Sequence, residues 1–163
     1  MAIISLVACR QQERNDLQFV NNYEQAKGWM HVLLEPGVAH SGRYSEKLVP
    51  GREFSHTFIL PLAAVDRMPV QQAEATVWIN AIELKTPLYL VMDVVSPDDK
   101  QHYRSVYVDA TPLQSGKKGW TKITARLDLK GLPVTEPLIF KSFVWNNGNQ
   151  TCWIDDFTVK FTR

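Results

Sequence analysis

Two adjacent carboxylates near the C-terminus are the side chains best suited to chemistry. Asp155 and Asp156 lie between Trp153 and Phe157, in a stretch that then alternates between apolar and polar residues. Acidic residues are poor strand formers, and strict alternation places Asp155 on the buried side with Asp156 on the other. Because a buried carboxylate is costly unless it is paired or metal-bound, the pattern indicates a bound cation. The alternatives are an ion pair with Arg43 or a lysine, or hydrogen bonds from backbone N–H groups.

Recognisable catalytic motifs are missing from the sequence. It contains no G-x-S-x-G, P-loop or H-E-x-x-H pattern. The four histidines, His31, His40, His56 and His102, are scattered along the chain. A glycosidase needs only two carboxylates about 5–9.5 Å apart, so a small glycan-active enzyme stays an alternative. The sequence favours a protein that is not an enzyme.

The framework that must position these side chains is all-β. The sequence predicts about ten short strands with turn signals between them, a pattern typical of an antiparallel β-sandwich or barrel. Residues 62–67 could form one helical turn. The Asn-Asn-Gly-Asn stretch at 146–149 predicts a tight turn that joins the last two strands into a hairpin. The clearest strands are expected at 17–20, 54–60, 74–81, 87–95, 103–110, 120–129, 138–145 and 152–161.

Composition narrows the class of protein. The 163 residues fit one domain with a sizeable core, which we place at 15–163 after an N-terminal segment at 1–14. The net charge is +1 and both signs are mixed along the chain, so nucleic acid is not an expected partner. No run approaches the roughly 20 apolar residues that a transmembrane span requires.

The N-terminal segment suggests export. Leu6-Val7-Ala8-Cys9 has the form of a bacterial lipobox, which would put a lipid anchor on Cys9 and make residues 10–15 a polar tether. The apolar run before Cys9 is short and lacks the positive start of a signal peptide. The alternative interpretation is an ordinary first strand at 3–7. An anchored protein would lie at the cell surface or in the periplasm, and Cys152 would then be a lone buried cysteine.

Four short motifs occur in a defined order along the chain. They are Phe19-Val20-Asn21-Asn22-Tyr23-Glu24 followed by Gly28-Trp29, then His40-Ser41-Gly42-Arg43-Tyr44-Ser45, Gly119-Trp120-Thr121-Lys122-Ile123, and Trp153-Ile154-Asp155-Asp156-Phe157. Together they resemble the calcium-containing β-jelly-roll carbohydrate-binding modules, a galactose-binding-like family with xylan- and β-glucan-binding members. The resemblance covers nearly the whole chain.

This resemblance implies a jelly-roll sandwich with a structural Ca²⁺ that joins the N-terminal segment to the last strand. The implied ligands are Glu24, one of Asp155 and Asp156, and carbonyls of the turn from Ser41 to Arg43. Calcium prefers carboxylate and carbonyl oxygens, which such a set supplies. Asp155 is the preferred ligand of the pair because alternation buries it.

The resemblance also implies that the protein binds a polysaccharide or oligosaccharide on a sheet face or at loop ends, without catalysis. Aromatic rings pack against the C–H face of a sugar, and polar neighbours pair with its hydroxyl groups. The open alternative is a structural or protein-interaction domain of a surface lipoprotein, whose aromatic side chains pack under loops. The outward-facing candidates from alternation are Trp78, Asn80, Tyr89, Asp93, Tyr107, Lys141 and Trp145, whereas Trp29, Trp120 and Trp153 are expected to be structural.

Overall fold

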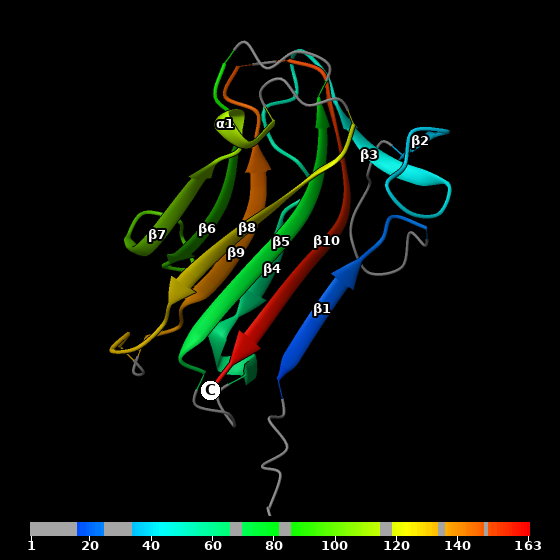
Figure 1. The fold of residues 1–163 in the computed structure, drawn as a ribbon. Coiled ribbons are helices and arrows are strands. Elements are labelled where there is room, and N and C mark those ends of the chain that lie inside the picture. The colour runs from blue at the N-terminus through cyan, green and yellow to red at the C-terminus, as the bar shows by residue number, and fades with distance from the viewer. Residues whose placement is uncertain are drawn as a thin grey trace, which may run out of the picture.

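The computed structural model shows two antiparallel sheets packed face to face (Figure 1). The described residues are 16–24, 34–65, 70–81, 86–114, 119–133, 136–148 and 150–163.

The first sheet has the strand order β2-β3-β10-β5-β8. Strand β1 pairs with the second half of the long strand β10, whereas β3 pairs with its first three residues, so β1 and β3 lie on the same side of β10 (Figure 1). The bounds are β1 Leu17–Asn21, β2 Leu34–Pro36, β3 Tyr44–Leu48, β5 Gln72–Ala81, β8 Thr121–Asp128 and β10 Cys152–Thr162.

The second sheet has the order β4-β9-β6-β7. From β3 to β10 the chain changes sheet after every strand except between β6 and β7, which pair as neighbours; this is the strand exchange of an eight-stranded jelly roll. This confirms the predicted fold class. The bounds are β4 Phe58–Pro61, β6 Tyr89–Val95, β7 His102–Asp109 and β9 Ile139–Trp145, with a 3-10 helix η1 at Leu62–Val65 and a short helix α1 at Thr111–Gln114.

The core lies between the sheets and follows the predicted alternation. Ala75, Val77 and Ile79 of β5 are fully buried. Phe140 of β9 packs edge-on against Phe161 of β10, with ring centroids 5.0 Å apart. Burying a side chain of this size contributes about 1.5–3 kcal/mol. The same alternation turns every second residue of these strands outward, where candidate binding residues were expected.

The predicted hairpin between the last two strands is wrong. Strand β9 pairs with β4 and β6, whereas β10 pairs with β1, β3 and β5, so residues 146–151 cross from one sheet to the other. Buried Asn146 shapes this crossing, because its amide donates to the carbonyl of Gln150 (2.6 Å) and accepts from the Gln150 N–H (3.1 Å). The asparagine therefore acts through its side chain, and Gly148 has no positive φ.

The predicted placement of Asp155 on the core-facing side with Phe157 was also wrong, because β10 contains a β-bulge. The register shifts between Asp155 and Thr158, and Asp156 has a φ of 46°. A bulge adds one residue and so resets the alternation. Ile154 and Phe157 both face the core, whereas Asp155 lies opposite Trp78 on the outer side of its sheet. Asp155 is nevertheless buried, since the turn before β3 covers it.

The N-terminal predictions fall outside the described residues. This applies to the segment 1–14 with Cys9, and to Gly28 and Trp29 of the first motif. In the part of the chain that the structure describes, no helix has the length and apolar character needed to cross a membrane.

Candidate functional site

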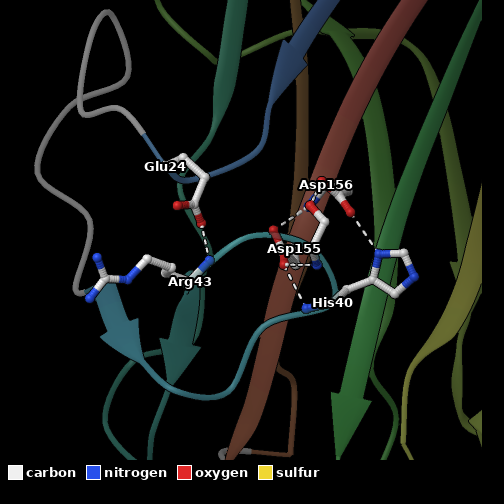
Figure 2. A network of polar contacts seen from close by, with 6 residues as sticks. Glu24, His40, Arg43, Asp155 and Asp156 are labelled. Atoms are coloured by element: carbon white, nitrogen blue, oxygen red, sulfur yellow. Dashed lines mark hydrogen bonds and ion pairs between the residues drawn. The ribbon is translucent and has the colours of Figure 1, made fainter.

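The sequence-predicted cation ligands gather around one turn, residues 38–44, that leads into β3 (Figure 2). We call this the clamped turn. Asp155 is 0% exposed beneath it. Its Oδ2 accepts hydrogen bonds from the backbone N–H groups of His40 (2.7 Å) and Ser41 (3.1 Å), and its Oδ1 accepts from that of Asp156 (2.7 Å). Burial raises the pKa of the Asp155 carboxyl, and these N–H groups oppose the rise.

Asp156 holds the same turn through side chains. Its Oδ1 accepts from the Ser41 hydroxyl (2.7 Å), and its Oδ2 lies 2.6 Å from His40 Nδ1. The His40 imidazole also packs against two tryptophans. It stacks on Trp78 with ring centroids 3.7 Å apart and meets Trp120 edge-on at 5.9 Å. The left-handed backbone at Asp156 aims its carboxylate at these two donors.

Glu24 grips the turn from its other end. Its Oε1 accepts from the N–H groups of Arg43 (2.6 Å) and Tyr44 (2.8 Å). Gly42 permits this approach, because a Cβ there would lie 2.4 Å from the Glu24 carboxyl carbon. The residue also has a φ of +64°, a conformation that glycine adopts without strain.

The charge of these residues favours a cation site, whereas their geometry does not. Glu24, Asp155 and Asp156 bring three carboxylates to one turn, and among the described residues His40 is the basic side chain that they meet. Such an excess of negative charge fits a cation. Yet no group of three or more acidic, histidine or cysteine side chains in the described ranges is arranged to hold a metal ion. The hydrogen bonds observed are those of the alternative, backbone N–H groups on the carboxylates.

The candidate sugar-binding residues divide between the two sheets. Tyr89, Asp93, Tyr107, Lys141 and Trp145 share the outer face of the β4-β9-β6-β7 sheet. Trp78 and Asn80 lie on the outer side of the other sheet, where His40 stacks on Trp78 and Trp153 stands opposite Asn80. The structure therefore brings five of the seven together.

One end of the shared face is aromatic. Tyr89, Tyr107 and Trp145 form a triangle with ring centroids 5.6–6.4 Å apart. Phe54, from the β3–β4 loop, extends it with a ring nearly parallel to that of Trp145 (16°, 6.4 Å) and edge-on to that of Phe143 (5.6 Å). Tyr107 is 51% exposed and Phe54 is 47% exposed, whereas Tyr89, Phe143 and Trp145 are part-buried. We call these five side chains the aromatic face.

The other end of the face is polar. Asp93 lies four residues beyond Tyr89 on β6, about 13 Å along an extended strand. Its carboxylate accepts from Ser105 Oγ (2.8 Å) and lies 2.6 Å from His102 Nδ1. Lys141, in register with Asp93, donates to Asp99. Charged groups at this end are thus held in pairs beside the aromatic face.

The outer side of the other sheet has a different character. Arg126 of β8 pairs with Glu74 of β5 (2.6 Å), and Lys160 of β10 pairs with Asp16 (2.6 Å). The tryptophans of this side, Trp78 and Trp153, are part-buried, the first stacked under His40 and the second covered by the Lys47 ammonium group (5.6 Å from the ring centroid). Among the described Phe, Tyr and Trp side chains, the exposed ones are Phe54 and Tyr107, and both lie on the β4-β9-β6-β7 sheet, which distinguishes that sheet as the candidate binding surface.

Sequence reasoning missed Phe54, Phe143 and His40 as members of these sites. Phe143 was recoverable, since it shares the outward phase of Lys141 and Trp145. Phe54 lies outside the regular strands and joins the face through one isolated bridge to Trp145, which alternation cannot predict. His40 was identified as part of a turn motif, but its stacking on Trp78 depends on the fold.

Comparison with known proteins identifies the fold. No family model matches the chain, and no curated protein matches it by sequence. Among solved structures, it is similar to the second family 22 carbohydrate-binding module of Paenibacillus barcinonensis Xyn10C, a xylan-binding domain, with 13% identity, a TM-score of 0.56, and 88% of this chain and 99% of that chain covered. The first such module of the same protein aligns with 12% identity, a TM-score of 0.53 and coverage of 89% and 94%.

A third match comes from a different bacterium. The C-terminal family 22 module of Clostridium thermocellum Xyn10B aligns with 12% identity, a TM-score of 0.51 and coverage of 88% and 92%. At these identities the likeness concerns the backbone. The chain therefore has the β-sandwich fold of carbohydrate-binding modules.

Proposed function

We propose that this protein is a non-catalytic carbohydrate-binding module whose aromatic face binds a polysaccharide or oligosaccharide chain. The observation that carries the proposal is the cluster of five rings on one sheet, with Phe54 and Tyr107 exposed to solvent, continued by fixed hydrogen-bonding groups. Sugars present apolar C–H faces and a periphery of hydroxyl groups, so a binding surface needs both kinds of group. The similar modules are described as xylan-binding, which makes xylan the first ligand to test.

The arrangement of the two ends suggests how such a chain would lie. Tyr89 and Asp93 mark the two ends of the face and are about 13 Å apart on the same strand, so a ligand that reaches both ends must be longer than one sugar ring. Trp145 and Lys141 repeat the same aromatic-to-polar order on the neighbouring strand β9. A linear glycan aligned with β6 and β9 would place sugar rings on Trp145 and Tyr107 and hydroxyl groups near Lys141 and near His102, the exposed partner of buried Asp93.

We further propose that Ca²⁺ stabilises the clamped turn. Three carboxylates at one turn carry more negative charge than His40 offsets, and carbonyl oxygens of residues 41–43 could complete the coordination, as the sequence motifs imply. Any such ion would be structural, since it would lie on the sheet opposite the aromatic face. Melting curves with Ca²⁺ and with chelator test this, and identical melting temperatures would refute it.

Export is part of the same proposal. A protein that binds an extracellular polysaccharide must reach it, and the lipobox-like sequence ending at Cys9 offers a lipid anchor at the cell surface or in the periplasm. Lipid attachment is testable by metabolic labelling with a fatty-acid analogue. Loss of the label in Cys9→Ser is the expected result, and an unlabelled wild-type protein would remove the anchor from the proposal.

Affinity electrophoresis against a panel of soluble polysaccharides tests the binding function. An aromatic contact is worth about 0.5–1.5 kcal/mol beyond its buried area, so Tyr107→Ala and Trp145→Ala should each weaken retardation by about tenfold or more. Trp78→Ala is the matched control, since it removes a tryptophan from the opposite sheet, and its folding is checked by melting.

The outcomes separate the alternatives. Retardation that survives in Trp78→Ala but not in Trp145→Ala would support the proposal. Retardation lost in Trp78→Ala alone would move the site to the clamped turn. A wild-type protein that no polysaccharide retards would refute the sugar-binding function, and the exposed Phe54 and Ile59 (57% exposed) would then favour a protein-interaction surface.

A further inference from the structure

We propose that Glu46, buried inside the sandwich, is a positioning residue that fixes Phe54 on the aromatic face. The inference rests on the proposed function, because it assigns to the proposed binding site a buried residue that would not contact the ligand itself. Glu46 lies on β3, in register with Ile154 and facing the core, and it is 0% exposed. Its effect would pass through the loop between β3 and β4, residues 49–57.

The Glu46 carboxylate holds this loop on both sides of Phe54. Arg52 Nη2 donates to Oε1 at 2.5 Å, and the His56 N–H donates to Oε1 at 2.9 Å and to Oε2 at 3.2 Å. Phe54 is midway between these two residues in sequence. One carboxylate thus closes a short chain segment whose centre carries the exposed ring.

The segment is also registered against β9 at the position of Trp145. Ser55 exchanges hydrogen bonds with Val144, from its N–H to the Val144 carbonyl (2.9 Å) and from the Val144 N–H to its hydroxyl (2.8 Å). The Asn146 N–H donates to the Glu53 carbonyl at 2.6 Å. The neighbours of Phe54 are therefore bound to the neighbours of Trp145, which sets the two rings nearly parallel.

Energetics argue against a role in stability alone. A buried carboxylate loses its hydration, and an ion pair such as Glu46 with Arg52 recovers that loss only with good geometry and further hydrogen bonds. Phe54 itself is 47% exposed, so holding it still gains little burial. Fixing an exposed ring in advance instead removes the ordering cost of binding, about 0.5–1.5 kcal/mol for each immobilised side chain.

A double-mutant cycle on polysaccharide affinity tests the proposal. Glu46→Gln keeps the shape of the side chain but removes the charge that Arg52 requires, and it should raise Kd by about two- to twelvefold, the size of that ordering cost. Phe54→Ala should raise Kd at least as much. If Glu46 acts through Phe54, the double variant should bind no more weakly than Phe54→Ala, since coupled residues are not additive.

The effect of Glu46 on the position of Phe54 can also be measured without any ligand. Nuclear Overhauser contacts between the Phe54 and Trp145 rings should be strong in the wild type and weakened in Glu46→Gln. Glu35→Gln is the matched control, because it removes the ion pair with Lys47 (3.1 Å) and leaves the loop untouched. Should Glu46→Gln fail to fold, Arg52→Gln is the second variant. It removes the ion pair between Arg52 and Glu46 by a substitution at a side chain that is partly exposed.

The outcomes are distinct for the two proposals. A wild-type protein without polysaccharide affinity would refute the proposed function, while the ring contacts would still decide the positioning. A folded Glu46→Gln protein with unchanged ring contacts would overturn the role of Glu46, even if the aromatic face binds sugar. Additive losses in the double variant would overturn it as well, because Glu46 would then act independently of Phe54.

Discussion

Gly42→Ala tests the clamped turn at its tightest point. A Cβ at this position would lie 2.4 Å from both Cδ and Oε1 of Glu24, closer than real side chains approach. The glutamate is the flexible partner and must swing away, which breaks its hydrogen bonds to the N–H groups of Arg43 and Tyr44. The left-handed φ of +64° adds backbone strain for any residue with a Cβ.

The magnitude follows from these two effects. Left-handed strain costs about 1–2 kcal/mol. Hydrogen bonds to a charged group are worth about 1.5–3 kcal/mol each, and the low end applies because Glu24 is half-exposed. The loss of both bonds therefore adds about 3 kcal/mol, for a total destabilisation of about 4–5 kcal/mol. Urea unfolding followed by tryptophan fluorescence measures the change in unfolding free energy.

Gly37→Ala is the matched control in the same turn region. Gly37 has a φ of +86° with nothing within 4 Å of its Cβ position, so its substitution carries strain without a contact. We expect it to cost about 1–2 kcal/mol. Equal destabilisation by the two substitutions would refute the reasoning, because the contact between Gly42 and Glu24 would then contribute nothing.

Three further predictions concern buried groups. Burial raises the pKa of Cys152 to about 12, so peptide-resolved iodoacetamide labelling at pH 8 should modify it only in denaturant, and rapid labelling of native protein would contradict the buried position. Burial also raises the pKa of Glu46 above 4.5, more than Arg52 and the His56 N–H lower it. A carboxyl whose pKa is raised in the folded state contributes stability below pH 4.5, and this contribution is lost as the pH rises through the folded-state pKa. The wild type should therefore lose stability relative to Glu46→Gln as the pH rises through that window. A difference in unfolding free energy that does not change with pH would contradict the shift. Asn146→Ala should cost about 2–3 kcal/mol in urea unfolding, since it removes two buried hydrogen bonds that close the crossing between the sheets, whereas exposed Asn147→Ala should cost almost nothing.

The sequence was sufficient for the features that depend on local pattern. Alternation along β5, β6, β7 and β9 identified both the core side and the outward residues, because a strand buried on one face must separate apolar from polar side chains. The five residues that share the outer face, among them Tyr107 and Trp145, followed from that pattern alone. The sequence allowed one helical turn at 62–67, and the 3-10 helix η1 forms there at Leu62–Val65.

Features that depend on the choice of strand partner could not be predicted in this way. Strands β9 and β10 each bury one apolar side. The same alternation of apolar and polar residues would result from a hairpin within one sheet and from a crossing between two sheets, so the sequence could not distinguish them. The bulge at Asp156 shifts the phase of β10 without any change in composition, so the faces of Asp155 and Phe157 were assigned as one. Phe54 was expected in a strand at 54–60, but β4 begins only at Phe58, so Phe54 belongs to the loop before it.

The clamped turn and the aromatic face are expected to act independently of each other. Asp155 and Asp156 serve the clamped turn on the outer side of one sheet, while the aromatic face is on the outer side of the other. The core lies between them, so an ion at the turn would make no direct contact with the aromatic face. A cation at the turn should therefore set how firmly the N-terminal strands hold to β10, and the order of rings around Trp145 should depend on Asn146 and the β3–β4 loop instead. Polysaccharide affinity measured well below the melting temperature should accordingly be the same with and without chelator, even where chelator lowers that temperature.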